Sequence, residues 1–327
     1  MKFTVIIPLY NKAPYVRKAL ETVCAQTYRD YEIIVINDGS TDNSAIIAEE
    51  YLNGVEGISY KILSQQNAGV SAARNNGVAQ ASGDYIAFLD ADDWWEPTYL
   101  ERMAQLIEDY PEAGLYGMNY IYYKPGKTRV ALKCKTGYIN YPKEYYEGSA
   151  MMIFTSSSSS MPKRVFEEMG GFPLGIKLGE DFLLWAKTAL HYPVAFCEEP
   201  LAWYNNDVPV ALRATRNLHH PNNHMLFRMD SIAFSLSPLA SNLKSDWQAL
   251  LDKLRVNGLL EYWMSKEYHD MAAQELAKVD WSKQPENVKR IYKTPIWMLK
   301  VKRLVMKWGS AVKQAALRQA IRLKVRG

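Results

Sequence analysis

Four short apolar runs in the first third of the chain constrain its fold most. They consist mostly of β-branched and aromatic residues, as expected of strands in a buried sheet. The segments between them are long enough for one helix each, so the alternation predicts an α/β sandwich with a parallel sheet and right-handed crossovers. The expected strands are Phe3–Pro8, Tyr31–Asn37, Ser59–Ser64 and Tyr85–Leu89, and the expected helices run from Tyr15 to Ala25, from Asn43 or Ser44 to Leu52, and from Gly69 to Gln80.

Three aspartates directly follow the fourth expected strand. Asp90, Asp92 and Asp93 crowd like charges together, which is costly unless a cation neutralises them. Their hard oxygen ligands suit Mg²⁺ or Mn²⁺, ions that usually share their shell with substrate phosphates. The alternative is a solvated acidic turn that caps the next helix. The position at the carboxyl end of a strand favours a ligand site, since open α/β sheets bind ligands there.

The loop and helix before this strand supply further groups for a phosphate ligand. Asn67 and Gly69 provide turn chemistry at the start of the helix, and Arg74 lies one turn in. The Arg74 guanidinium can donate two parallel hydrogen bonds to a phosphate, or it can pair with the aspartates and hold them in place. Loop, helix and acidic strand end lie within about thirty residues, the size of one supersecondary unit.

Asp38 follows the second expected strand, beside the loop that follows the first. Its carboxylate can accept the imide N–H of uracil, and the ring of Tyr10 can stack on the base. An Asp-Gly turn in which Asp38 caps a helix is an equally physical alternative. The first turn has no Rossmann G-x-G-x-x-G pattern, which argues against a dinucleotide cofactor.

These groups belong to a longer series of motifs. They are Pro8-x-Tyr10-Asn11, Asp38-Gly39-Ser40-x-Asp42, Gln66-Asn67-x-Gly69, Ala73-Arg74-Asn75-x-Gly77 and Gly83-Asp84-Tyr85-Ile86-x-Phe88-Leu89-Asp90-x-Asp92-Asp93. Together they strongly resemble glycosyltransferase family 2, whose members use nucleotide sugars and have the GT-A fold. The resemblance implies metal binding by Asp92 with support from Asp90. It implies nucleotide-sugar binding by Pro8, Tyr10, Asn11, Asp38, Gln66, Asn67, Gly69, Arg74, Asp90 and Ala91.

A second acidic pair, Glu180-Asp181, opens a later expected helix. Helix capping alone would explain it, because the helix dipole favours negative charge there. The resemblance implies that Asp181 is the general base and that Glu180 orients the acceptor or the base. The Q-x-x-R-W pattern of processive family members is missing, so polymer synthesis in a continuous tunnel is not expected.

The expected function is inverting transfer of a sugar from a nucleotide sugar, UDP-linked, to a hydroxyl of a glycan or lipid-linked glycan in cell-surface polysaccharide assembly. Alternatives are a polyprenyl-phosphate sugar transferase and a non-catalytic nucleotide- or glycan-binding module of the same fold. A nucleotidyltransferase would carry a Gly-rich, Arg-containing loop after the first strand, which Leu9-Tyr10-Asn11-Lys12 is not. Mn²⁺ or Mg²⁺ is the expected cofactor, and one of His219, His220 or His224 could complete its shell, although a plain polar loop explains them as well.

The C-terminal end differs in charge from the rest of the chain. Residues 287–327 hold twelve Lys or Arg and no Asp or Glu, which leaves a formal charge of about −8 on the remainder. Between Ile296 and Ala316 apolar residues fall on one helical face and basic residues mostly on the others, a pattern typical of helices on anionic membranes. Packing on the catalytic domain or in a homodimer is the alternative. Nucleic acid is not an expected partner, because the catalytic body is acidic and no binding motif is present.

Location and domain limits follow from the same features. A first strand that begins at Phe3, three scattered cysteines and no long apolar run predict a cytoplasmic protein that attaches peripherally to the inner face of the cell membrane. The predicted domains are a catalytic domain at 1–222, with a nucleotide-sugar half at 1–110 and an acceptor half at 111–222, then a helical extension at 223–280, a linker at 281–295 and a basic amphipathic helix at 296–327.

Overall fold

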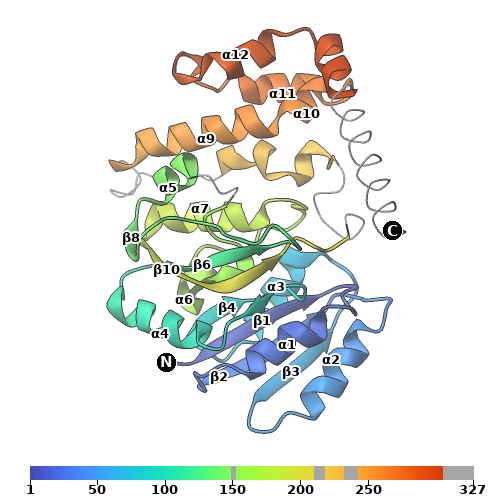
Figure 1. The fold of residues 1–327 in the computed structure, drawn as a ribbon, viewed down its shortest axis with the longest axis vertical. Coiled ribbons are helices and arrows are strands. Elements are labelled where there is room, and N and C mark those ends of the chain that lie inside the picture. Colours follow the sequence, from blue (N-terminus) through green and yellow to red (C-terminus); the bar gives the residue numbers. More distant parts are fainter. Residues whose placement is uncertain (149–151, 210–217, 232–241, 305–327) are drawn as a thin grey trace, which may run out of the picture. The chain divides into compact units, whose positions relative to one another are not determined.

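A computed structural model describes residues 1–148, 152–209, 218–231 and 242–304. The chain forms two compact units, Met1–Leu250 (unit 1) and Leu251–Gly327 (unit 2). Unit 1 carries a mixed sheet between two layers of helices (Figure 1). This confirms the predicted α/β class.

The first half of the sheet is parallel, in the order β3-β2-β1-β4. Its strands are β1 (Phe3–Leu9), β2 (Tyr31–Asn37), β3 (Ser59–Ser64) and β4 (Tyr85–Phe88), connected by α1 (Val16–Cys24), α2 (Ser44–Asn53) and α3 (Val70–Ala79). All seven predicted elements are present. Strand β1 continues through Pro8 to Leu9, because β4 ends opposite Ile6 and leaves Pro8 without a partner strand on that side.

The second half of the sheet is mixed, in the order β4-β9-β6-β10-β5. Its strands are β5 (Trp94–Trp95), β6 (Leu115–Tyr123), β9 (Ser159–Pro162) and β10 (Val194–Asn205), with β7 (Arg129–Val130) on β6 and β8 (Gly137–Ile139) on β10. A run of five serines forms the 3-10 turn Ser156–Ser158 and the start of β9. Strand β9 lies antiparallel to both β4 and β6, which joins the two halves.

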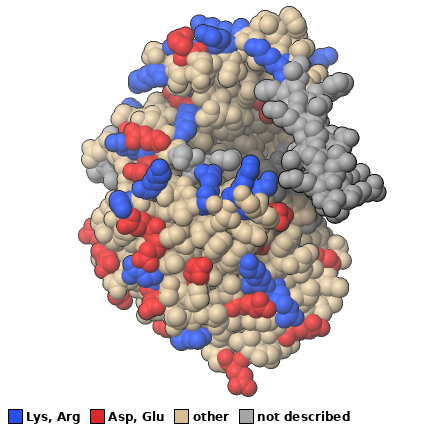
Figure 2. Space-filling model, in the orientation of Figure 1, with Lys and Arg blue, Asp and Glu red and all other residues tan. Residues whose placement is uncertain are grey.

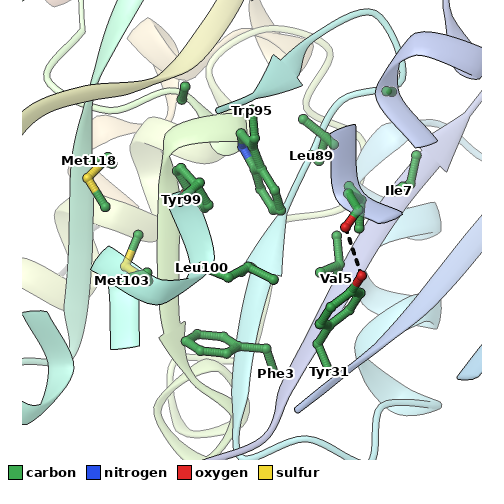
Figure 3. Close-up of a cluster of buried hydrophobic side chains, with 14 of the residues drawn as sticks. Phe3, Val5, Ile7, Tyr31, Leu89, Trp95, Tyr99, Leu100, Met103 and Met118 are labelled. Atoms are coloured by element: carbon green, nitrogen blue, oxygen red, sulfur yellow. Dashed lines mark hydrogen bonds between the residues drawn. The ribbon is translucent and has the colours of Figure 1, made fainter. Parts of the chain in front are cut away.

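Helices α1, α2 and α4 (Tyr99–Asp109) cover one face of the sheet and share its core with β1 and β2. Val5 and Ile7 of β1 point into this core (Figure 3). The Tyr31 hydroxyl donates to the Val23 carbonyl at 2.8 Å, so the one polar atom of that ring is satisfied. Trp95 stacks on Tyr99 with ring centroids 4.0 Å apart. The loop after the aspartates is therefore anchored in the core.

Helices α3, α6 (Lys163–Glu168) and α7 (Glu180–His191) belong to the opposite face, where Phe88 packs against the rings of Phe166 and Trp185. A Cβ at Gly77 would lie 2.7 Å from Ile6 Cγ2, so glycine allows α3 to approach β1 closely. This close packing fixes the distance between α3 and the sheet, and with it the position of Arg74, which lies on the same helix.

The remaining elements are mostly helical. They are α5 (Tyr141–Glu147), the 3-10 turns Pro221–Asn223, Met225–Phe227 and Met229–Ser231, α9 (Lys244–Gly258), α10 (Leu260–Met264), α11 (His269–Leu276), the 3-10 turn Trp281–Lys283, α12 (Glu286–Lys293) and helical residues 296–304. The C-terminal helical region is thus confirmed. Within the described residues, no helix has the length and apolar character needed to cross a membrane.

The predicted linker at 281–295 is not an irregular segment, since it contains α12. Two prolines flank that helix. Pro285 immediately precedes α12 and Pro295 immediately precedes the helical residues 296–304, positions where proline does not interrupt helical hydrogen bonds. The division of the chain into functional domains stays a prediction.

Candidate functional site

The loops after β1, β2 and β4 meet at one edge of the sheet, because the strands are parallel and in register. Leu9 pairs with Asn37, and Ile6 pairs with Phe88. The loop before α3 joins them through Asp38. Sequence-predicted groups from four separate segments are therefore brought together at the carboxyl end of the sheet.

Asp38 is buried and organises the loop before α3. Its Oδ1 accepts from Gln65 Nε2 at 2.8 Å and from the Ala68 N–H at 2.9 Å, and its Oδ2 accepts from the Gly69 N–H at 2.9 Å. Asn67 Nδ2 donates to the Asp38 carbonyl at 3.0 Å. Gly69 has a φ of +90°, which favours glycine there. The Asp38 carboxylate keeps acceptor capacity on Oδ2 for a ligand, while Gln66 and Asn67 are exposed beside it.

The loop after β1 is held by the loop after β2. Asn11 has a φ of +50°, and its Oδ1 accepts from the Thr41 N–H at 2.8 Å. The Ala13 N–H donates to Asp42 Oδ2 at 3.1 Å. Pro8 lies in β1 just before Leu9, where the strand ends, and Tyr10 in the loop is 47% exposed, so its ring can stack on a planar ligand.

Arg74 connects the two acidic clusters predicted from the sequence. Its Nη2 lies 2.6 Å from Asp90 Oδ1, and its Nη1 lies 2.9 Å from Glu180 Oε1. The Arg74 side chain is only 3% exposed. The sequence suggested two roles for Arg74, and in the structure its guanidinium pairs with carboxylates. A buried guanidinium between two carboxylates fixes both in place, which suits Arg better than Lys.

The other two strand-end aspartates have different partners. Asp92 Oδ2 lies 2.5 Å from the Lys12 ammonium. Asp93 is buried, where its Oδ2 accepts from the Ser157 hydroxyl at 2.5 Å and its Oδ1 from the Asn205 N–H at 2.8 Å. Burial raises the pKa of Asp92, and burial and the neighbouring carboxylates raise the pKa of Asp93 well above its usual range. Asp93 is therefore a structural group that ties the site to the serine turn, and buried Ala91 lies between the aspartates.

Asp181 opens α7 beside Glu180. Its Oδ1 accepts from the Phe182 N–H at 2.7 Å. Burial, followed by the charge of Glu180, raises the pKa of Asp181 to about 7, although Arg74 opposes the shift. A carboxylate with this pKa is suited to accept a proton near neutral pH.

The donor set at the sheet edge fits a divalent ion shared with a phosphate ligand. Asp90 and Asp92 offer hard carboxylate oxygens and keep 31% and 18% of their side chains exposed. The described residues contain no group of three or more His, Cys, Asp and Glu side chains placed to hold a metal. The ion would therefore need oxygens from the ligand or from water.

The three candidate histidines flank the 3-10 turns after β10: His219 and His220 precede Pro221–Asn223, and His224 lies between that turn and Met225–Phe227. His220 Nδ1 accepts from the Asn222 N–H at 3.2 Å, and His224 Nδ1 accepts from the Leu226 N–H at 3.1 Å. Burial lowers the pKa of His224 to about 4. In these two rings one nitrogen caps a local turn, and His219 precedes them in the same segment.

Several residues of the site escaped the sequence argument. Lys12 lies in a loop where nothing distinguishes it from a solvated lysine, and Asn205 contributes only a backbone N–H. Ser157 lies in a run of five serines, where nothing in the sequence marks one hydroxyl as the partner of Asp93. Gln65 directly precedes the motif Gln66-Asn67-x-Gly69. Because that motif forms a turn next to Asp38, the sequence could have indicated the contact between Gln65 and Asp38.

Comparisons with known proteins give matches in sequence and in fold. A family model described as "Glycosyl transferase family 2" matches residues 4–170. "Glycosyltransferase GlyA" of Streptococcus pneumoniae is 38% identical over 201 residues, 58% of this chain and 28% of that protein. "Putative glycosyltransferase EpsH" of Bacillus subtilis is 40% identical over 145 residues, 44% of this chain and 41% of that protein. The chain thus spans less than half the length of these two relatives.

Two solved structures share the fold. Staphylococcus aureus TarS 1-349 in complex with UDP-GlcNAc matches with a TM-score of 0.70 and 19% sequence identity. The match covers 89% of this chain and 84% of the TarS chain. The mannosyltransferase PcManGT from Pyrobaculum calidifontis, in complex with GDP-Man and Mn²⁺, matches with a TM-score of 0.51 and 18% sequence identity. The match covers 86% of this chain and 88% of the PcManGT chain. The likeness confirms the expected fold.

Proposed function

The chain belongs to glycosyl transferase family 2, and we propose that it transfers a sugar from a UDP-linked nucleotide sugar to a hydroxyl of a glycan or lipid-linked glycan, with inversion. The observation that carries this proposal is the ion-pair chain Asp90–Arg74–Glu180. It holds Asp90 beside the helix that presents Asp181. This link between the expected donor side and the expected base supports direct displacement, which requires both reactants to be positioned.

Asp181 is the base of the proposed reaction. The acceptor oxygen forms a bond to the anomeric carbon as the bond from that carbon to the diphosphate oxygen breaks, and the hydroxyl proton goes to the Asp181 carboxylate. The pKa of about 7, raised by burial, supports this role near neutral pH. Glu180 is engaged by Arg74 and so is assigned to positioning.

Asp92 and Asp90 would hold the divalent ion, Mn²⁺ or Mg²⁺. When bound, such an ion supplies positive charge next to the departing diphosphate. The two carboxylates leave most of the ion's shell to the diphosphate and to water, which is the usual mode for Mg²⁺. A histidine from the 219–224 segment stays a candidate ligand.

The donor nucleotide is assigned to the edge formed by Pro8, Tyr10, Asn11 and Asp38. The exposed Tyr10 ring supports base stacking, and the remaining acceptor capacity of Asp38 Oδ2 suits the imide N–H of uracil. The exposed segment Gln66–Gly69 would contact the sugar or diphosphate. The UDP-GlcNAc bound to TarS is consistent with a UDP donor, whereas the GDP-Man of PcManGT makes GDP the competing base.

The acceptor is assigned to a growing cell-surface polysaccharide or a lipid-linked precursor, on the cytoplasmic side of the membrane. Peripheral attachment would hold the enzyme beside a lipid-linked acceptor. Trp297, Val301 and Leu304 of unit 2 are 67%, 50% and 58% exposed at helical spacing. Lys300 and Lys302 are exposed on the same helix, whereas the visible face of unit 1 mixes both signs of charge (Figure 2). This combination favours an anionic surface.

Ligand-induced thermal stabilisation tests the donor proposal. UDP with Mn²⁺ should raise the melting temperature more than GDP, CMP or ADP with Mn²⁺, because binding to the folded state alone stabilises it. Asp92→Asn should melt as the wild type does without ligand and should lose the part of the UDP effect that depends on Mn²⁺. Stabilisation by GDP alone would overturn the uracil assignment, and stabilisation by no nucleotide would contradict the function itself.

A further inference from the structure

We propose that Lys12 is a diphosphate-binding residue that pairs with Asp92 until the nucleotide arrives. The proposal rests on the proposed function, because it assumes a nucleoside diphosphate at the edge of the sheet. The observation behind it is separate from the family motifs: the Lys12 ammonium lies 2.5 Å from Asp92 Oδ2, and each of these side chains is only 18% exposed.

The backbone of Lys12 is held firmly at this position. Its N–H donates to the Ser44 hydroxyl at 2.7 Å. Its two neighbours are also tied to the loop after β2, Asn11 through its contact with Thr41 and Ala13 through its N–H to Asp42. The backbone of Lys12 is thus held in place, whereas its four-carbon side chain can change conformation. The ammonium can therefore change partner without a rearrangement of the loop.

The three strand-end aspartates differ in how exchangeable their partners are. Asp93 is fully enclosed, and Asp90 is held by a guanidinium that also binds Glu180. Among the described residues, the Lys12 ammonium pairs with Asp92 alone. If the divalent ion binds Asp92 Oδ2, Lys12 must leave that oxygen, and a diphosphate at the same edge offers the freed ammonium a new partner. Lysine is well suited to this, since it binds phosphate as a point charge.

The exchange couples the two ligands. A divalent ion alone competes with Lys12 for Asp92, whereas a diphosphate draws Lys12 away and leaves the carboxylate to the metal. Nucleotide and metal must then strengthen each other's binding by the same factor. Removal of the Lys12 charge should consequently raise the affinity for the metal alone and lower the affinity for the diphosphate. A purely structural lysine would not produce these opposite effects.

Titration of the full chain with each ligand separately tests the proposal. In Lys12→Met, Mn²⁺ alone, followed by the EPR signal of the free ion, should bind several-fold more tightly. UDP, measured by calorimetry in excess chelator, should bind about tenfold more weakly, because one charge-assisted contact is lost. Lys12→Arg should recover part of the UDP affinity. Lys2→Met, which removes the same charge at the opposite end of β1, is the control and should change neither affinity.

The outcomes separate the two proposals. Wild-type chain that binds neither UDP nor GDP contradicts the proposed function, and with it a diphosphate role for Lys12. UDP binding by the wild type that Lys12→Met leaves unchanged overturns the Lys12 assignment alone. The same holds if both affinities fall together, because a general loss of structure would then explain the result.

Discussion

At the scale of single residues, the site depends on giving chemically similar carboxylates different surroundings. Asp38 binds N–H groups of its neighbouring loop, Asp90 pairs with Arg74 and Asp92 pairs with Lys12. Among the described residues, Asp181 accepts a backbone N–H and forms no ion pair. Burial, followed by the charge of Glu180, raises its pKa.

The raised pKa predicts opposite pH dependences for activity and stability. The unfolded chain loses the Asp181 proton near the ordinary pKa of about 4, whereas the folded chain keeps it up to about 7. The contribution of Asp181 to the free energy of unfolding should thus fall as the pH rises between these values. Transfer should increase over the upper part of the same range, since the base must be ionised.

Urea unfolding of Asp181→Asn at about pH 5 and about pH 8 measures the stability effect. The variant should gain stability relative to the wild type mainly at the higher pH. Asp109→Asn, which removes an exposed carboxylate from α4, is the matched control and should show little change at either pH. A gain for Asp181→Asn that is the same at both pH values would contradict the raised pKa.

At the scale of elements, local patterns predicted the parallel half of the sheet and its helices but not how the strands of the mixed half pair. Alternating strands and helices are visible within short windows, so β1 to β4 and α1 to α3 follow from the sequence. The insertion of β9 between β4 and β6 depends on pairing between segments about 75 residues apart, such as Tyr85 with Pro162. No local pattern specifies that register.

The same limit applies to the site. The positions of Asp38 and Asp90 follow from the rule that parallel strands end at one edge, and the sequence was enough to bring them together. Their partners were not predictable in this way. Lys12 and Asp92 are 80 residues apart, and Arg74 and Glu180 are 106 apart. These contacts depend on side-chain direction and on how α7 packs, which only the three-dimensional structure specifies.

At the scale of the whole molecule, the charge is divided unevenly along the chain. The catalytic part is acidic overall, and the last forty or so residues carry twelve basic groups without an acidic one. The helix predicted for 296–327 is described only as far as residue 304, and the rest lies outside the described residues. In the described part, Arg303 pairs with Glu261, while Lys300 and Lys302 stay exposed.

Flotation with lipid vesicles tests the membrane proposal. The full chain should float with vesicles that contain anionic lipid, because each basic residue near the surface contributes about 1 kcal/mol at modest salt. A chain that ends at Gln284 should remain in the soluble fraction, and neutral vesicles should bind both chains weakly. Equal flotation of the two chains would contradict the proposal, and concentration-dependent self-association of the full chain alone would favour packing between copies instead.

The central claim is that Asp181 takes the acceptor proton at a site where the donor is held by other groups. The most direct measurement compares wild type and Asp181→Asn in two assays: binding of a UDP-sugar with Mn²⁺ by calorimetry, and release of UDP in the presence of a cell-envelope glycan acceptor. The variant should bind the donor with about the wild-type affinity and release UDP at least about a hundredfold more slowly. UDP release at the wild-type rate, or loss of donor binding in the variant, would contradict the assignment of Asp181 as the base.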